Sequence, residues 1–383
     1  MSFLLEKEQE NKNKKAAEES DLHMSFSYDI VRPLQRRLNT VDPPVKDQVN
    51  WNIIEKGSEK TRKEQRYKIT AETIKSAQDV IRNDIRQTKC RRISILRDEG
   101  FTIFVKEECD QFLSSVKIRG VAYVLKNWQI QKKKYNGIIG ISTSCFAFCL
   151  CSYAKEYEVP VTMVLPTQVP SELVRICRNV LSARVLVQGN DIVEAHKIAL
   201  RIAKMEGLLY LDGNDHPDMI IGQATLGNEI CGHIKHNIDT VILATKFNGC
   251  GLTMGIAMAI KLLNPGVRII EVHPAVSDPL IDNIRSQTNS LNELDDIPVT
   301  EYAWQEEKSN LPINCIDTIV KVDESLISTA YYMLQHEGII DNSGAIAIAA
   351  FLSGKLDELK GKRVMIPLFG EMDSSDELKR KYN

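Results

Sequence analysis

The chain has 383 residues, of which 43% are hydrophobic and 26% are charged, and its formal net charge is -2. A chain of this size can bury a large core and is expected to form about two domains. The near-neutral charge gives no electrostatic reason to expect a nucleic acid or an acidic membrane surface as the main partner, so small-molecule chemistry is the default expectation.

The hydrophobic runs and the first residues indicate where in the cell the protein is expected. The longest apolar runs, 118–125 and 137–151, are too short or too interrupted to cross a bilayer. The opening sequence, MSFLLEKEQENKNKK, places charged residues directly after a short apolar patch, which is unlike a secretory signal. We therefore expect a cytoplasmic protein without a membrane partner, and reduced, buried thiols for its 9 cysteines.

The first part of the chain differs from the rest in composition and in hydrophobic periodicity. Residues 1–66 are rich in Glu, Lys, Asn and Gln and show no sustained periodicity, which predicts a flexible N-terminal extension. From Tyr67 on, Thr70 is suited to cap a helix, with the acidic Glu72 close behind it. The apolar residues at helical spacing are Ile74, Ala77, Val80, Ile81 and Ile85.

Short apolar runs then alternate with helix-length segments. The predicted strands are FTIFV (101–105), GIIGIS (137–142), VTMVLP (161–166), ARVLVQ (183–188), TVILAT (240–245), RIIEVH (268–273), TIVKV (318–322) and RVMIPL (363–368). Nearly continuous apolar strands separated by helices are typical of parallel sheets that helices cover on both faces. We expect an α/β protein with two such sheets, and ligands beyond the carboxyl ends of the strands.

Two loops after predicted strands have the composition of binding loops. In KFNGCGLTMG (246–255), Gly249 and Gly251 let the backbone approach a bound group, and the following helix offers free amides to an anion. A plain glycine-containing turn is the alternative for this loop. In TSCFAF (143–148), hydroxyl side chains stand at a helix start, and capping alone would account for them.

A lysine stands between these features. In VKIRGVAYVLK (116–126), an apolar stripe at helical spacing places Lys117 near the first turn of a buried helix, although a surface position is the ordinary alternative for a lysine. The stripe consists of Ile118, Val121, Val124 and Leu125. Burial beside a helix N-terminus disfavours the ammonium form, and a desolvated amine is suited to a Schiff base. A loop that could bind phosphate, such as 246–255, together with a lysine of this kind suggests pyridoxal phosphate.

On these residues the sequence resembles the fold-type II pyridoxal-phosphate enzymes, in the branch of serine racemase and threonine (serine) dehydratase. The resemblance covers nearly all of residues 67–373. SVKIRG (115–120) matches the family's Ser-Phe-Lys-x-Arg-Gly motif, which implies that Lys117 is the Schiff-base lysine. KEECDQ (106–111) and IIGQATLGNEI (220–230) are similar to two further family segments.

The resemblance implies a tryptophan synthase beta-like fold with two domains, each built on a mostly parallel sheet covered by helices. The large cofactor domain would comprise 67–136 and 214–383, the small domain 137–213, and the extension 1–66. A homodimer is implied as well. The metal-binding glutamate of some relatives aligns with His273, with Asp278 nearby, and we expect no metal site.

The site residues depart from the family pattern at several positions. The asparagine that would bond the cofactor's ring oxygen is Cys145, a poor donor, and the histidine after it is Phe146. Leu368 stands where a serine or cysteine would face the pyridine nitrogen. The implied cofactor-binding residues are Lys117, Ser144, Cys145, Asn248, Gly249, Cys250, Gly251 and Leu368.

The activity that the resemblance implies is elimination or racemisation of L-serine or L-threonine with pyridoxal 5'-phosphate. Lys117 would remove the α-proton, and Thr143 aligns with the hydroxyl that serves the opposite face in racemases. Elimination would release a keto acid and ammonia. The altered residues leave a second interpretation open, a catalytically weak or inactive relative with a structural or regulatory role. β-Replacement chemistry, as in cysteine synthases, is a third and fits SVKIRG less well.

Overall fold

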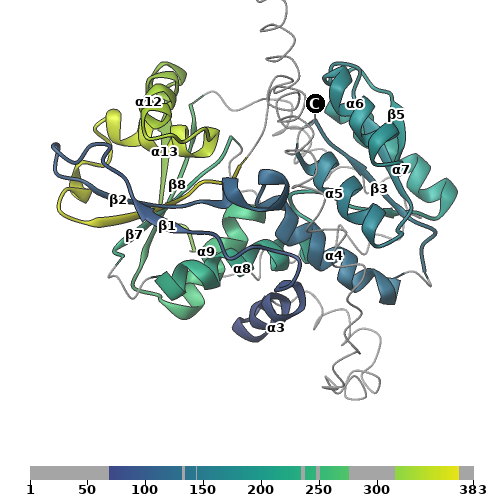
Figure 1. Ribbon diagram of the computed structural model, residues 1–383, viewed down its shortest axis with the longest axis horizontal. Coiled ribbons are helices and arrows are strands. Elements are labelled where there is room, and N and C mark those ends of the chain that lie inside the picture. The colour runs from purple at the N-terminus through teal and green to yellow at the C-terminus, as the bar shows by residue number, and fades with distance from the viewer. Residues whose placement is uncertain are drawn as a thin grey trace, which may run out of the picture. The chain divides into compact units, whose positions relative to one another are not determined.

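Two β-sheets flanked by helices organise the protein (Figure 1). The computed structural model describes residues 69–131, 134–143, 145–233, 238–246, 251–275 and 315–370. The predicted extension, 1–66, lies outside the described residues. The predicted α/β class is confirmed, because parallel strands and helices alternate along the chain.

The larger sheet has six strands in the order β1-β2-β10-β7-β8-β9. Their bounds are β1 (Cys90–Arg92), β2 (Thr102–Lys106), β10 (Arg363–Pro367), β7 (Thr240–Ala244), β8 (Arg268–Pro274) and β9 (Thr318–Val322). All neighbours are parallel except β1 and β2, which pair antiparallel. β1 was not predicted, because its three residues Cys-Arg-Arg contain no apolar run.

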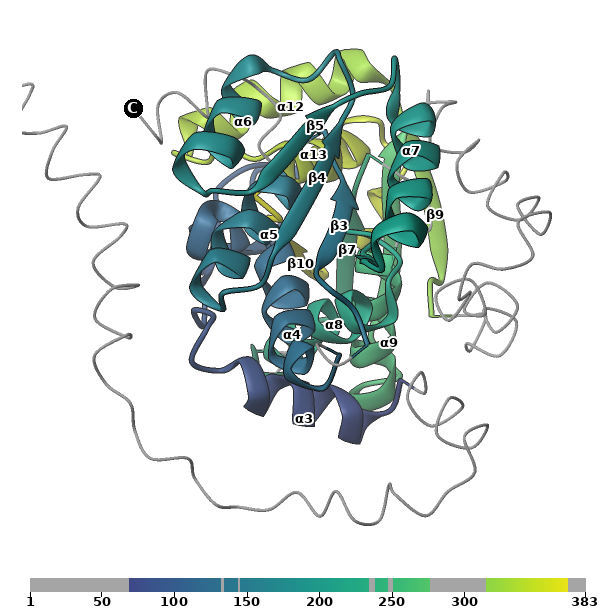
Figure 2. The same ribbon diagram turned by 90° about the vertical axis from the view of Figure 1, so that its right-hand side faces the viewer.

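The smaller sheet has four parallel strands in the order β5-β4-β3-β6. Their bounds are β5 (Arg184–Val187), β4 (Val161–Leu165), β3 (Ile138–Ile141) and β6 (Leu209–Tyr210). Figure 2 shows α5 (Cys145–Glu156) and α6 (Ser171–Arg175) on one side of this sheet and α7 (Ile192–Glu206) on the other. Because both faces are covered, β4 is buried along its whole length, as its unbroken apolar sequence predicts.

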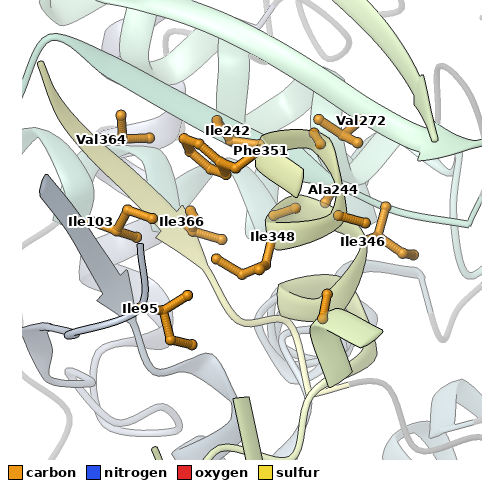
Figure 3. Packing of buried hydrophobic residues seen from close by; sticks show 14 of the residues in the cluster. Ile95, Ile103, Ile242, Ala244, Val272, Ile346, Ile348, Phe351, Val364 and Ile366 are labelled. Atoms are coloured by element: carbon orange, nitrogen blue, oxygen red, sulfur yellow. The ribbon is translucent and has the colours of Figure 1, made fainter. Parts of the chain in front are cut away.

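Helices cover the larger sheet on both faces as well. On one face lie α12 (Glu324–His336) and α13 (Asn342–Leu352), and on the other lie α3 (Ala71–Ile81), α8 (Pro217–His233) and α9 (Gly251–Leu263) (Figure 1). The core under α13 interleaves helix and strand side chains (Figure 3). Residues of that core include Ile103, Ile242, Val272, Ile346, Ile348, Phe351, Val364 and Ile366.

The helix at the start of the described chain matches its prediction in its cap. The Thr70 hydroxyl oxygen accepts a hydrogen bond from the Thr73 amide at 3.2 Å, and the Thr73 hydroxyl oxygen accepts one from the Thr70 amide at 2.8 Å, which forms a capping box. Ile74, Ala77 and Ile81 are buried as predicted. Val80 is 40% exposed, so its place in the predicted apolar stripe was wrong.

The helix that carries the candidate lysine, α4 (Lys117–Gln131), begins at that residue. The predicted stripe is confirmed, because Ile118, Val121, Val124 and Leu125 are all at most 3% exposed. The predicted domain boundaries stay a prediction, although the smaller sheet lies wholly within 137–213. Residues Tyr67–Asp373 together form one compact unit.

Candidate functional site

Lys117 lies at the junction of a short turn and α4. The turn is η3 (Phe112–Ser114), a single turn of 3-10 helix, and the Val116 amide after it donates to the Phe369 carbonyl at 2.9 Å, just beyond β10. The Lys117 amide in turn donates to the Ser115 hydroxyl at 3.3 Å. These two hydrogen bonds fix the backbone position from which the Lys117 side chain extends. Lys117 is only 6% exposed, so the predicted burial is confirmed.

The amine of Lys117 is held by two uncharged acceptors. Its Nζ donates to the Gly213 carbonyl at 3.0 Å and to the Asn214 Oδ1 at 2.7 Å. Both acceptors follow β6 of the smaller sheet, whereas Lys117 follows β2 of the larger one. Because both acceptors are uncharged, the amine has no ion pair with a carboxylate that must break before it reacts. This arrangement suits a nucleophile.

The loop that holds the amine is itself braced by carboxylates. Asp212 Oδ1 accepts the amides of Asn214 at 2.7 Å and Asp215 at 2.9 Å, an Asx turn that orients the Asn214 side chain. Asp215 Oδ1 accepts the Gly251 amide at 2.7 Å and so links this loop to the start of α9. This loop was not among the predicted binding segments. Its signal is the turn-forming run Asp-Gly-Asn-Asp (212–215) directly after a strand.

An aromatic ring closes one side of this loop. A Cβ on Gly213 would lie 2.6 to 2.8 Å from three ring carbons of Phe146, and one on Gly140 would lie 3.4 Å from the same ring. Phe146 is 4% exposed. Glycine is therefore required at position 213, because any side chain would occupy the place of the Phe146 ring. Phe146 packs directly against the residue whose carbonyl holds Lys117.

Ser115 links the start of α5 to the start of α4. Cys145 Sγ lies 3.3 Å from the Ser115 Oγ, the same hydroxyl that receives the Lys117 amide. Thr143 is exposed in the turn before α5, and within the described residues it makes no hydrogen bond to Lys117. The structure thus brings Cys145 and Lys117 to one hydroxyl. Ser144 lies outside the described residues.

The end of β10 is apolar where the resemblance expects a polar group. Leu368 is fully buried, and its Cδ2 lies 2.7 Å from the place that a Cβ on Gly344 would take. Its side chain belongs to the core under α13. A pyridine nitrogen facing this position would therefore meet hydrocarbon.

A buried carboxylate lies next to this apolar position. Asp341 caps α13, accepting the Ser343 hydroxyl at 2.5 Å, the Gly344 amide at 2.7 Å and, from beyond Leu368, the Gly370 amide at 2.7 Å. Burial raises the pKa of Asp341, and the hydrogen bonds from Ser343, Gly344 and Gly370 act in the opposite direction. These bonds tie the end of β10 to the start of α13.

Of the four residues 248–251 that the resemblance assigns to the cofactor, the structure describes Gly251. It begins the 13-residue helix α9, and a Cβ there would lie 2.2 Å from the Asn214 carbonyl oxygen, so only glycine fits. In this structure its amide is bonded to Asp215. Asn248, Gly249 and Cys250 lie outside the described residues. The helix end that would face an anion is thus brought to the loop that holds the lysine.

These positions allow a test of whether the residues suit pyridoxal phosphate. Lys117 fits the aldehyde, because it is buried, uncharged groups hold its amine, and its backbone is fixed on both sides. The N-terminus of α9 suits an anion, because its Gly251 amide already donates to the Asp215 carboxylate, which a phosphate would have to displace. Leu368 does not fit the ring nitrogen, and Cys145 is a weak partner for the ring oxygen. The anchoring residues therefore suit the cofactor, while one residue that would tune its ring does not.

No cluster of three or more His, Cys, Asp or Glu side chains within the described ranges is arranged to hold a metal ion. His273 is buried in β8, and Asp278 lies outside the described residues. None of the described helices is long and apolar enough to span a bilayer. None of the described cysteines is joined in a disulfide.

Known proteins match this architecture over most of its length. A solved structure of maize serine racemase superposes with a TM-score of 0.65 at 22% identity, covering 81% of this chain and 96% of that one. Processed threonine deaminase isoform 2 of Solanum lycopersicum superposes with a TM-score of 0.64 at 25% identity, covering 85% and 94%. The first likeness shows the fold alone.

Sequence comparison agrees with the fold. L-threonine ammonia-lyase of Thermotoga maritima is 31% identical over 310 residues, which are 79% of this chain and 75% of the relative. The family model described as pyridoxal-phosphate dependent enzyme matches residues 81–370, a span that contains both sheets and Lys117. The predicted resemblance is confirmed, and the chain belongs to the family of pyridoxal-phosphate dependent enzymes.

Proposed function

We propose that the protein is a pyridoxal-phosphate-dependent ammonia-lyase or racemase that acts on L-serine or L-threonine. The observation that carries the proposal is the buried Lys117 at the start of α4. Its amine donates hydrogen bonds to the Gly213 carbonyl and to the Asn214 side chain. The names of the relatives, threonine ammonia-lyase, threonine deaminase and serine racemase, support this substrate class.

Each residue has a role in this proposal. When bound, pyridoxal phosphate supplies an aldehyde for covalent attachment and a ring that accepts electrons from the substrate α-carbon. Lys117 Nζ provides the attachment and takes the α-proton. Thr143 Oγ1, exposed in the turn before α5, holds the proton for the opposite face. Ser144 and the loop 248–251 are the proposed contacts to the cofactor.

A specific observation favours a second candidate, a catalytically weak or inactive relative with a structural or regulatory role. Leu368 offers no hydrogen bond to a ring nitrogen, and the Cys145 thiol is engaged with Ser115. One missing hydrogen bond to a buried polar group costs about 1–3 kcal/mol. Two such losses would slow turnover by roughly one to several powers of ten.

One experiment separates the two candidates. The purified protein is incubated with pyridoxal phosphate and L-serine or L-threonine, and ammonia, keto acid and the D-enantiomer are measured. A parallel sample without substrate is reduced with borohydride and digested. Turnover together with a pyridoxyl group on Lys117 supports the enzyme. Label without turnover supports the second candidate, and absence of both overturns the cofactor site.

The matched control replaces the lysine itself. Lys117→Ala should remove the label and all turnover while the far-ultraviolet circular dichroism spectrum stays that of the native fold. Continued labelling of the folded variant would show that another amine binds the cofactor.

Assembly and location complete the proposal. We propose a homodimer in the cytoplasm, with the division into 67–136 plus 214–383 and 137–213 as its two domains. Sedimentation equilibrium tests the dimer, and limited proteolysis followed by mass spectrometry tests the domain boundaries.

A further inference from the structure

A buried cation lies on the same helix as Lys117, two residues further on. Arg119 donates through Nε and Nη2 to the two carboxylate oxygens of Glu108 at 2.7 and 2.9 Å, and through Nη1 to Glu229 Oε1 at 2.8 Å. The other oxygen of Glu229 accepts Lys106 Nζ at 2.8 Å. We call these four residues the ion network. It joins β2, α4, α8 and η2 (Glu108–Asp110).

The ion network is closed and uncharged overall. Lys106, Glu108 and Arg119 have no exposed surface, and Glu229 is 7% exposed. Thr88 satisfies two remaining groups, because its hydroxyl donates to Glu108 Oε1 at 2.6 Å and its carbonyl accepts Lys106 Nζ at 2.7 Å. Two cations and two carboxylates leave a net charge of zero.

The charges of its central pair are firmly held. Burial by itself would raise the pKa of Glu108, but the charge and hydrogen bonds of Arg119 hold that pKa below its ordinary value. Burial would likewise lower the pKa of Arg119, and Glu108 and Glu229 raise it instead. Both groups are therefore ionised in the folded protein at neutral pH.

The backbone around Arg119 packs closely against α8. A Cβ on Gly222 of α8 would lie 2.5 Å from the Arg119 carbonyl oxygen, and one on Gly120 would lie 2.7 Å from the Met219 side chain. Helices α4 and α8 thus approach each other through Gly120 and Gly222, and Gly120 lies within one turn of Lys117. Apolar residues often replace buried ion pairs without loss of stability, so stability alone does not account for four buried charges at this point.

We propose that the ion network positions Lys117: it anchors the first turn of α4 to β2 and α8, and it keeps the charge behind the amine at zero. The amine is thereby held at Gly213 and Asn214, and the ion network adds no net charge to its surroundings. The inference rests on the proposed function only in taking Lys117 as the amine that binds the cofactor.

The test changes the network charge in both directions. Glu108→Gln keeps the shape and leaves a net charge of +1, Arg119→Met leaves -1, and the double variant is neutral again. For each protein, Lys117 is labelled over a range of pH with formaldehyde and cyanoborohydride, and separately with pyridoxal phosphate and borohydride. Peptide mass spectrometry then gives the pH of half-maximal labelling at Lys117.

The expected shifts have opposite signs. A net positive charge disfavours the ammonium form, so half-maximal labelling of Glu108→Gln moves to lower pH by roughly 0.5 to 1 unit, and that of Arg119→Met moves to higher pH by a similar amount. The neutral double variant returns towards the wild-type profile. A purely structural role would move both single variants in the same direction or in neither, and either result overturns the proposal.

All variants leave the other ionisable groups around Lys117 in place. These groups are Asp212, Asp215, His216, Asp218 and Cys145. Ile348→Ala, in the core under α13, is the uncharged destabilising control: it should lower thermal stability without moving the labelling profile. A shift in this control would assign the effect to lost stability.

A second pair keeps the test decisive if Arg119→Met does not fold. Glu229→Gln and Lys106→Met change the charge by +1 and -1 at the other end of the network, and their double variant restores neutrality. The formaldehyde arm also separates this proposal from the proposed function. A wild-type protein without turnover or pyridoxyl label would overturn that function, while the opposite formaldehyde shifts would still support the ion network.

Discussion

Lys117 Nζ donates to the side-chain oxygen of Asn214 at 2.7 Å, although the two residues are 97 positions apart. Lys117 follows a strand of the six-stranded sheet, and Asn214 follows a strand of the four-stranded sheet. The candidate site is therefore assembled from the carboxyl ends of strands in both sheets, where ligands of parallel sheets collect.

Asn214→Ala should weaken cofactor attachment. Lys117 would keep only the Gly213 carbonyl, and a hydrogen bond that involves a charged group contributes about 1.5–3 kcal/mol. We expect roughly tenfold less pyridoxyl-Lys117 at limiting pyridoxal phosphate, measured by peptide mass spectrometry after borohydride reduction. Asn228→Ala, which removes a bond to Gln78 on α3, is the control and should label as wild type does. Equal labelling of both variants would contradict a positioning role for Asn214.

Phe146→Ala should destabilise the protein and also disturb the lysine. The buried ring packs on Gly213, so its removal leaves a cavity and should lower the free energy of unfolding by about 3–5 kcal/mol in urea titrations. Phe148→Ala, equally buried on the same helix, should cost a similar amount. Only Phe146→Ala should reduce labelling of Lys117. A matching loss in Phe148→Ala would mean that stability alone controls the label.

Leu368→Ser should lower the stability of the protein and raise its affinity for the cofactor. Removing a buried leucine costs about 2–5 kcal/mol, while a hydroxyl facing the ring nitrogen should add about 1 kcal/mol of cofactor binding, or five- to tenfold in affinity. Absorbance titration with pyridoxal phosphate and a urea titration measure the two effects. Leu356→Ser, buried in the same core, should lose stability without gaining affinity. No gain in Leu368→Ser would show that this position does not face the ring.

Acid should destabilise the protein partly through Glu108. Although burial acts to raise the pKa of this carboxyl group, Arg119 lowers it below the ordinary value of 4.5, so the unfolded chain takes up the proton at higher pH than the folded chain. The stability from Glu108 is therefore present above about pH 4.5 and is lost as pH falls through the folded pKa. Glu108→Gln should have a lower melting temperature at pH 7 and a shallower decline between pH 6 and pH 3. Parallel declines in the two proteins would assign acid sensitivity to other carboxyl groups.

Periodicity predicted most elements of the fold because each depends on local properties of the chain. The unbroken apolar runs at 161–166 and 240–245 became buried parallel strands, and the stripe beginning at Ile118 became the buried face of α4. The two described strands that escaped prediction, β1 and β6, are three and two residues long. Such strands exist only because a neighbouring strand pairs with them, and no local pattern encodes that pairing.

The sequence by itself determined the fold class, the helix that begins at Lys117 and the departures at Cys145 and Leu368, because these follow from residue type and local spacing. Only the tertiary structure decided what surrounds the lysine. Asn214 holds its amine, and Arg119, two residues further along α4, pairs with Glu108 and with Glu229, which also pairs with Lys106. These contacts join residues about 10 to more than 120 positions apart, so they arise only when the sheets and helices have packed and the buried charges must find partners.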